Sequence, residues 1–273
     1  MPDPSFPLSG TTRLHFIVGD PIVQVKSPAG VTGAFAQRGH DAVCLPVHVT
    51  RADLATWLQG VSLGRNVDGI IATVPHKFAC HGLCASHTER ARFVGAVNTM
   101  RRDAQGRWHG DMLDGVAFVQ ALRDQGYEPA GRRALLVGAG GAGSAISWAL
   151  VEAGVAELAI HDVDTTRRDG LIQCLAALRR AHVRVGSDDP AGFDLAVNAT
   201  PAGMQACDPL PLQANRLEPS AWAGCVITAP AVTPFIAAAR ARGCATVTGS
   251  DMFEHVRDLM VDFLLDQGTT GCA

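Results

Sequence analysis

The amino-acid sequence predicts an α/β fold with parallel strands, divided between two domains. Short apolar runs alternate with segments of helical spacing almost from end to end, as in chains built from βαβ units. A glycine-rich turn joins a strand to a helix near the middle of the chain. The length of 273 residues and a hydrophobic content of 47% are enough for two cores of ordinary size.

The first half of the chain contains apolar runs that we interpret as strands, over residues 14–19, 42–49 and 67–74. Segments with helical spacing, residues 28–39 and 51–61, lie between them. Because parallel strands need helical crossovers, this order predicts an N-terminal α/β domain.

Residues 131–164 form a complete βαβ unit, with a strand ending at Val137, a helix closed by Gly154 and a second strand ending near His161. Further strands are expected within residues 193–204, 224–230 and 245–250. The last segment, residues 251–268, has helical periodicity. We therefore expect a substrate-binding domain over residues 1–113, a Rossmann domain over 114–251, and residues 252–273 packing back on the first domain.

The composition favours a small-molecule substrate. The net charge is −3, without a basic stripe or an acidic run, which argues against nucleic acid or an anionic membrane as the main partner. The N-terminal residues lack the pattern of a signal peptide, and no apolar run is long enough to span a membrane. We expect a cytoplasmic monomer or homodimer.

The eight cysteines are scattered singly, as expected of reduced thiols. Cys80, His81, Cys84 and His87 form the one local cluster of metal-ligating residue types, but no second ligand pair stands at zinc-finger spacing. We therefore predict no metal site, and a helix whose thiols face the core.

Residues 138–143, GAGGAG, match the dinucleotide-binding pattern G-x-G-x-x-G at Gly138, Gly140 and Gly143. Between a strand and a helix, this pattern lets backbone N–H groups approach a pyrophosphate. Asp162 follows Gly138 at about the 20-residue distance expected for an acid that binds the ribose hydroxyls.

The position of Asp162 favours NAD over NADP, because a carboxylate there repels a 2′-phosphate. Asp162 could instead serve the start of the next helix, a role that also suits Asp164. Arg167 and Arg168 keep NADP open, since arginines near this strand end can hold the phosphate.

Lysine is rare in this chain: of 23 basic residues, only Lys26 and Lys77 are not arginine. An ammonium group can exchange a proton at working pH, whereas a guanidinium stays charged. Lys77 therefore suggests proton transfer. The other interpretation is an exposed helix start after Pro75.

The chain resembles the shikimate dehydrogenase family through motifs that follow one another over nearly its whole length. These are GDPIVQVKSP, VDGIIATVPHK, GAVNTM, GDMLDGVAF, GAGGAG, VNATPAGM and GSDMFEHV. The resemblance implies a substrate domain, a Rossmann domain, and a C-terminal helix that returns to the first domain. It also implies reversible oxidation of a ring hydroxyl in shikimate, quinate or an amino-shikimate, with hydride passing to NAD.

The resemblance implies roles for individual residues. Lys77 and Asp114 match the catalytic pair, although Asp114 could also cap its helix. Ser27 matches a serine that binds the substrate carboxylate, and Thr73 and Asn98 match residues that hold ring hydroxyls. Residues matching the dinucleotide site are Gly138, Ala139, Gly140, Gly141, Ala142, Gly143, Asp162, Arg167, Asn198, Thr200, Pro201, Ile227 and Gly249.

The predicted substrate pocket departs from the family pattern where a polar contact is usual. Gln24-Val25 replaces the family's His-Ser, so that a carboxylate-binding hydroxyl is lost at Val25. Val256 stands in place of a glutamine, and Thr228 in place of a tyrosine often found there. A substrate group left buried and unpaired costs about 1–3 kcal/mol, so we expect a substrate that differs from shikimate at one end.

A nucleotide-binding sensor on the same fold, with little or no turnover of shikimate, is the alternative function. Lys77, Asp114, Asn98 and Thr73 are retained together, and a sensor has no evident need for a proton-transfer pair. The sequence therefore favours the dehydrogenase.

Overall fold

The computed structural model describes residues 8–205 and 207–266. The chain forms two compact units: the first runs to Asp111 and also takes in residues from Arg257 onward, and the second is Met112–Val256. Cys272 and the first seven residues, on which the signal-peptide argument partly rests, lie outside the described residues.

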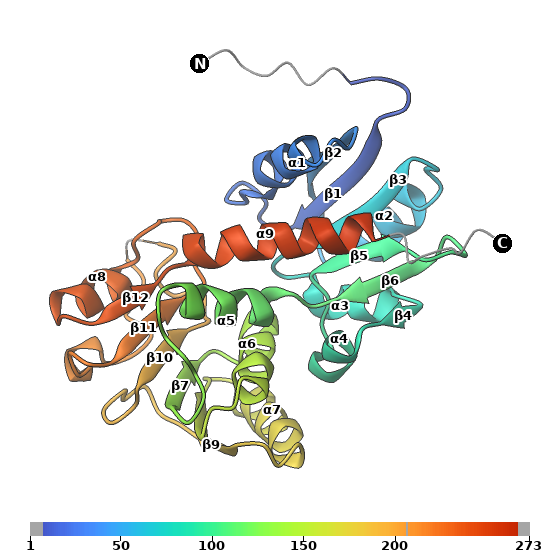
Figure 1. Ribbon diagram of the computed structural model, residues 1–273. Coiled ribbons are helices and arrows are strands. Elements are labelled where there is room, and N and C mark those ends of the chain that lie inside the picture. Colours follow the sequence, from blue (N-terminus) through green and yellow to red (C-terminus); the bar gives the residue numbers. More distant parts are fainter. Residues whose placement is uncertain (1–7, 206, 267–273) are drawn as a thin grey trace, which may run out of the picture. The chain divides into compact units, whose positions relative to one another are not determined.

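The first unit is built on a six-stranded sheet with the strand order β2-β1-β3-β5-β6-β4 (Figure 1). The elements are β1 Arg13–Gly19, α1 Ser27–Gln37, β2 Ala42–His48, α2 Leu54–Val61, β3 Val67–Ala72, α3 Lys77–Leu83, β4 Ser86–His87, α4 Glu89–Val94, β5 Thr99–Arg102 and β6 Trp108–Asp111.

This sheet is only partly parallel, which corrects the sequence prediction. Strands β2, β1 and β3 are parallel, whereas β5 pairs antiparallel with both β3 and β6. The antiparallel strands are short and carry charged residues, as in TMRR of β5, so they show neither an apolar run nor a clean alternation. Pairing with a neighbouring strand, rather than intrinsic preference, makes them strands.

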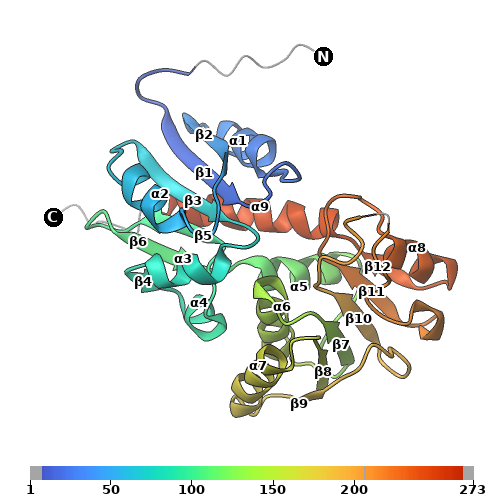
Figure 2. The same cartoon turned by 180° about the vertical axis from the view of Figure 1, so that it is seen from behind.

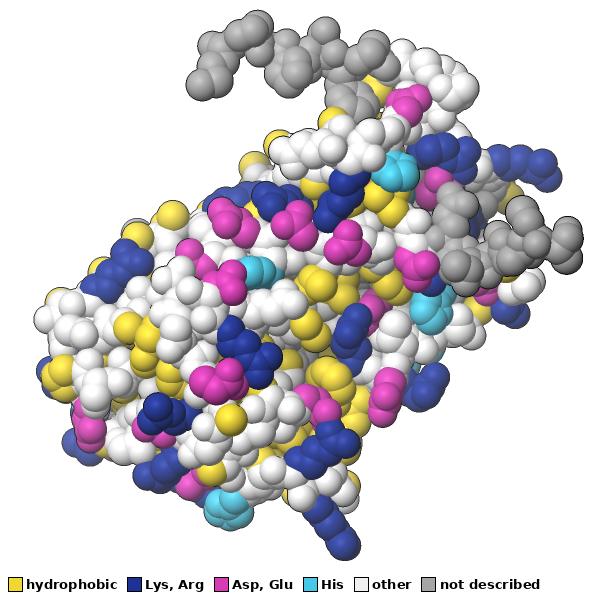
Figure 3. All heavy atoms as spheres, viewed as in Figure 1, with side chains coloured by type: hydrophobic (Ala, Val, Ile, Leu, Met, Phe, Trp, Pro, Cys, Tyr) yellow, Lys and Arg dark blue, Asp and Glu magenta, His cyan; other side chains and the backbone are white. Residues whose placement is uncertain are grey.

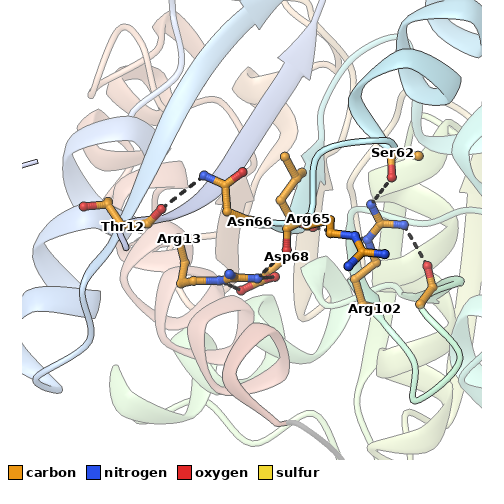
Figure 4. Close-up of polar contacts among 9 residues, drawn as sticks. Thr12, Arg13, Ser62, Arg65, Asn66, Asp68 and Arg102 are labelled. Carbon is orange, nitrogen blue, oxygen red and sulfur yellow. Dashed lines mark hydrogen bonds and ion pairs between the residues drawn. The ribbon is translucent and has the colours of Figure 1, made fainter. Parts of the chain in front are cut away.

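Arginine side chains brace the amino-terminal edge of β1 and β3 (Figure 4). Arg13 donates to Asp68 through Nε at 2.6 Å and forms a second bond from Nη2 to the same carboxylate. Arg102 donates to the carbonyl oxygens of Ser62 at 2.8 Å and Gly106 at 2.7 Å. These bonds tie the loops between strands to the sheet.

The part of α9 (Gly249–Leu265) from Arg257 onward belongs to the first unit, whereas its first turns, through Val256, belong to the second. Asp262 forms an ion pair with Arg38 at 3.0 Å, and Asp266, just after the helix, pairs with Arg101 at 3.1 Å. The ring of Phe263 stacks on His109. The last turns of α9 are therefore an integral part of this unit.

A buried histidine in β1 gives the first unit a predictable acid sensitivity. His15 is 2% exposed, packs on Phe35, and has no hydrogen-bond partner for Nδ1 within the described part of the chain. Burial lowers the pKa of His15 from 6.5 to about 4. Between these values the unfolded chain binds a proton that the folded chain does not.

We expect the free energy of unfolding to fall by about 3 kcal/mol as the pH drops from about 6.5 to about 4, through this one group. His15→Leu should remove that component, and His40→Leu, at an exposed position of the same unit, should retain it. Urea unfolding across this pH range measures the difference. If the free energy of unfolding falls equally with pH in wild type and in His15→Leu, His15 is not the source of the acid sensitivity.

The second unit contains a six-stranded, fully parallel sheet with the order β12-β11-β10-β7-β8-β9 (Figure 2). Its elements, besides the start of α9, are α5 Asp114–Asp124, β7 Arg133–Val137, α6 Gly141–Glu152, β8 Glu157–His161, α7 Thr165–Ala177, β9 His182–Val185, β10 Leu195–Asn198, a 3₁₀ turn Ala214–Arg216, β11 Trp222–Cys225, α8 Pro234–Ala241 and β12 Ala245–Val247.

The strand order reverses between β7 and β10, as in dinucleotide-binding Rossmann domains. Because crossovers between parallel strands are right-handed in nearly all proteins, this order puts the helices following β7 and β8 on one face of the sheet and the helix following β11 on the other. The crevice at the carboxyl ends of β7 and β10 is the place where this fold binds ligands. The predicted Rossmann domain is confirmed.

The surface carries no large region of one charge on the face drawn in Figure 3, where basic and acidic side chains are interspersed. Among the helices that the structure describes, none has the length and apolarity needed to cross a membrane.

Candidate substrate and dinucleotide sites

In the first unit, Thr73 lies at the carboxyl ends of β1 and β3. Its N–H donates to the carbonyl oxygen of Val18 at 3.0 Å. A Cβ added to Gly19 would lie 2.5 Å from Cγ2 of Thr73, so only glycine lets the end of β1 approach the Thr73 side chain this closely. The strand ends thus place the Thr73 side chain at the edge where open α/β sheets bind ligands.

Lys77 and Asn98 are brought next to Thr73 by backbone hydrogen bonds. The carbonyl of Thr73 accepts from His76 N–H at 2.8 Å, and α3 begins one residue later, at Lys77. The carbonyl of Lys77 accepts from Val97 N–H at 2.9 Å, and that of Asn98 accepts from Ala72 N–H at 2.8 Å. The predicted proton-transfer amine therefore shares one edge with residues predicted to hold ring hydroxyls.

Ser27 and Val25 occupy the connection from β1 to α1. Ser27 is the first residue of α1 and is 6% exposed, and Pro28 follows it in the first turn. Val25 is half-buried, and its N–H donates to the carbonyl of Ile22 at 3.3 Å.

His76 is a residue of this edge that the sequence analysis did not single out. Its side chain is fully buried, and Nε2 donates to the carbonyl of Val49 at 2.8 Å. This bond ties the start of α3 to the segment after β2 and fixes the proton on Nε2. The sequence feature that could have indicated a role for His76 is its position directly before Lys77.

In the second unit, the glycine turn after β7 is closed by tight backbone contacts. Gly138 has a φ of +104°, and its N–H donates to the carbonyl of His161 at 2.8 Å. A Cβ on Gly143 would lie 1.8 Å from the carbonyl oxygen of Gly138. The N-terminus of α6 follows at Gly141, so free backbone N–H groups and the helix dipole favour an anion here.

Asp162 lies beside this glycine turn. Its carboxylate accepts from Ala139 N–H at 2.6 Å and from Asp164 N–H at 2.8 Å. The helix-capping role belongs to Asp164, which accepts from Arg167 N–H at 3.0 Å and forms an ion pair with the Arg167 side chain at 3.3 Å. Each carboxylate oxygen of Asp162 has a second lone pair, so the group can still accept from a ribose hydroxyl.

Asn198 and Thr200 form a rigid corner at the end of β10. The buried Asn198 accepts from the N–H and hydroxyl of Thr200 and donates to the carbonyl of Ala202 at 3.0 Å. A Cβ on Gly138 would lie 2.8 Å from Cγ2 of Thr200, so this corner adjoins the glycine turn. Pro201 follows on the exposed side.

Other predicted residues of the second unit lie after β11 and in α9. A Cβ on Gly249 would lie 2.2 Å from the carbonyl oxygen of Ile227, so α9 begins against that backbone. Thr228 is the next residue along, and Val256 is buried within α9.

Asp114 is the first residue of α5 and is 5% exposed. Leu113, rather than Asp114, holds the N-cap position, so the carboxylate sits one residue inside the helix, in its favourable first turn. The backbone of Gly115 lies against the carbonyl of Ala145 in α6, since a Cβ there would approach it to 2.0 Å. Asp114 and Lys77 belong to different units.

The cysteines in the described ranges 8–205 and 207–266 are free thiols. Cys80 of α3 is buried, as predicted, whereas Cys84 lies just after the helix and is half-buried. Burial raises the pKa of the Cys80 thiol to about 12. His81 and His87 stack on one another with ring centroids 4.0 Å apart. Within these ranges no three His, Cys, Asp or Glu side chains are arranged to hold a metal ion.

Known proteins are similar to this chain over most of its length. Residues 17–100 match the shikimate dehydrogenase substrate binding domain. The chain is 37% identical to "Shikimate dehydrogenase (NADP(+))" of Rubrobacter xylanophilus over 251 residues, which cover 90% of this chain and 88% of that protein.

Solved structures of similar fold include enzymes that are not named shikimate dehydrogenase. Quinate dehydrogenase from Corynebacterium glutamicum in complex with NAD is 31% identical, with a TM-score of 0.82 and coverage of 93% and 94% of the two chains. Ligand-free 5-ketofructose reductase of Gluconobacter is 26% identical, with a TM-score of 0.81 and coverage of 93% of each chain.

Proposed function

The chain belongs to the shikimate dehydrogenase family, and from that premise we propose that it is an NAD-preferring dehydrogenase of a shikimate-like ring alcohol. The observation that carries the proposal is the edge of the first unit where Thr73, Lys77 and Asn98 meet. Quinate and amino-shikimate type compounds belong to the same substrate class. The cytoplasmic location and oligomeric state stay predictions.

Each catalytic role follows from the chemistry of oxidising a secondary alcohol. A nicotinamide dinucleotide held at the glycine turn of residues 138–143 would supply the hydride acceptor for this oxidation. The hydroxyl must lose its proton at the same time, which requires a base. We assign this proton transfer to Lys77, assisted by Asp114, while Thr73 and Asn98 hold neighbouring hydroxyls.

Asp162 supports the preference for NAD. Its carboxylate is fixed beside the glycine turn by two backbone N–H groups, and it would repel a 2′-phosphate there. The named relative from Rubrobacter uses NADP, whereas the quinate dehydrogenase structure contains NAD. The nature of the residue at position 162 is therefore the deciding feature in our proposal.

We expect NAD to bind at least about tenfold more tightly than NADP, a difference of about 1.4 kcal/mol. Fluorescence titration of both dinucleotides, followed by redox turnover with a panel of ring alcohols, tests the proposal. Arg180→Ala, at an exposed arginine that pairs with Glu152 away from the glycine turn, is the control and should leave both affinities unchanged. Equal or tighter binding of NADP would contradict the preference, and binding without any turnover would favour the sensor.

Val25 supports a substrate altered at the end that the family binds through serine hydroxyls. The similarity to a reductase named for 5-ketofructose supports testing compounds other than ring acids. We expect Val25→Ser to raise kcat/KM for shikimate by about two- to tenfold, the usual worth of one neutral hydrogen bond.

The control for Val25→Ser is Val23→Ser, in the same loop, where the side chain is 92% exposed. Steady-state kinetics with shikimate and NAD measure both variants. Ordinary efficiency of the wild type with shikimate, or no gain in a folded Val25→Ser variant, would show that Val25 does not set the substrate.

A further inference from the structure

His76 stands directly before Lys77 and is fully buried in the first unit. Its Nε2 donates to the carbonyl oxygen of Val49 at 2.8 Å. A carbonyl only accepts hydrogen bonds, so Nε2 carries a proton. The bond joins the start of α3 to the segment after β2, across 27 positions of sequence.

This bond completes a connection between the ends of β1, β2 and β3. Val49 N–H donates to the carbonyl of Gly19 at 3.2 Å, and Thr73 N–H donates to the carbonyl of Val18 at 3.0 Å. The carbonyl of Thr73 in turn accepts from His76 N–H at 2.8 Å. The His76 side chain therefore adds a link to the end of β2 for a turn whose backbone is already bonded to β1.

Lys77 lies between this connection and the segment before β5. The carbonyl of Lys77 accepts from Val97 N–H at 2.9 Å, and the carbonyl of His76 accepts from Cys80 N–H at 2.8 Å. The backbone that carries the Lys77 side chain is thus held from two sides. Loss of the His76 side-chain bond would weaken one of them.

Packing alone does not account for a histidine at this position, because the ring carries an unpaired nitrogen. Nδ1 is buried and has no hydrogen-bond partner among the residues that the structure describes. Buried polar atoms are almost always paired, so an apolar side chain of similar size would fill the position without burying Nδ1. What the histidine adds is one directional bond to Val49, at a place where function requires a fixed geometry.

We propose that His76 is a positioning residue for proton transfer, whose bond to Val49 holds the start of α3 and thereby the Lys77 amine. The inference rests on the proposed function and deepens it. His76 touches no substrate in this role, since its side chain is fully buried. A displacement of about 1 Å can cost about 10²-fold in rate, so the bond affects the chemical step rather than dinucleotide binding.

The test compares His76→Gln with His76→Met. Glutamine places an N–H donor as many bonds from Cα as Nε2 of histidine, whereas methionine is similar in length and has no donor. We expect His76→Met to lower kcat for ring-alcohol oxidation about 10- to 100-fold, with KM and NAD affinity nearly unchanged. His76→Gln should restore most of the rate.

Trp108→Phe is the matched control, because it removes another buried donor of the same unit, which bonds Ser62 Oγ at 2.9 Å. This variant should keep the wild-type kcat. Circular dichroism and thermal melts verify folding. His76→Phe, which keeps a ring without a donor, takes the place of His76→Met if that protein does not fold.

A residue that acts only through Lys77 has no further effect once that amine is removed. His76→Met added to Lys77→Ala should therefore leave the residual rate unchanged. The same fold-loss in both backgrounds, or a wild-type rate in folded His76→Met, overturns the inference, while turnover by wild type still supports the proposed function.

The rarity of lysine allows a measurement that needs no turnover. In protein labelled with ¹³C at lysine Cε, Lys26 and Lys77 are the only sources of signal. The Lys77 signal, identified by its loss in Lys77→Ala, should shift in His76→Met and return in His76→Gln, with Lys26 as the internal control. If wild type oxidises no ring alcohol, the proposed function fails and this spectrum decides the positioning role. A shift confined to Lys77 supports it, and an unchanged Lys77 signal or an equal change of both overturns it.

Discussion

Lys77→Ala is expected to lower kcat/KM by about 10²–10⁴-fold, the usual contribution of a positioned proton-transfer group. The lysine belongs to the first unit and the glycine turn to the second, so NAD affinity should stay nearly unchanged. Lys77→Arg should fail as well, because a guanidinium cannot give up its proton at working pH.

The measurements are single-turnover hydride transfer, followed by nicotinamide absorbance, and dinucleotide titration of the same preparations. Lys26→Ala, at the other lysine of the chain, is the matched control and should retain most of the activity. Substantial activity in Lys77→Arg would mean that only the positive charge matters, and the acid–base role would be wrong.

The second unit could be predicted from sequence more fully than the first, for a physical reason. Its central strands are largely buried and read as continuous apolar runs, such as ALLV before the glycine turn. The glycines then mark a backbone geometry that few other residues adopt. Periodicity and turn chemistry agree there, so the strand ends and the start of α6 follow from the sequence.

The antiparallel part of the first unit could not be predicted this way. Strands β5 and β6 have four residues each and include arginine, histidine and aspartate. Their hydrogen-bond partners come from β3 and from each other, which local sequence does not encode. Asn98 directly precedes β5, and its neighbours become visible only through backbone pairing.

The hydrogen bonds of single side-chain atoms could not be predicted from the sequence either. The sequence shows that Gln24 departs from the family pattern, but the bond from its Nε2 to the carbonyl of Pro21 depends on how the loop folds. From the sequence alone, either Asp162 or Asp164 could likewise cap the next helix. The structure assigns the cap to Asp164 and leaves Asp162 beside the glycine turn.

Gly143→Ala should destabilise the second unit by about 3 kcal/mol, the upper end of the usual cost of overpacking. The added Cβ would lie 1.8 Å from the carbonyl oxygen of Gly138, and backbone on both sides limits any relaxation. Gly140→Ala should leave stability unchanged, because its φ is −74° and a Cβ there meets no atom within 4 Å.

The two variants separate packing from ligand binding. In this motif the second glycine leaves room for the pyrophosphate, so Gly140→Ala should weaken NAD binding by at least about tenfold, or about 1.4 kcal/mol. Gly170→Ala, in α7 and likewise in open space, is the control and should leave NAD binding unchanged while stabilising the protein by no more than about 1 kcal/mol. Thermal unfolding without NAD measures stability. The further rise in melting temperature with NAD measures binding, because tighter binding of a ligand to the folded protein stabilises it more. A folded Gly140→Ala protein with wild-type NAD affinity would place the pyrophosphate away from this turn and remove the basis for assigning the dinucleotide site.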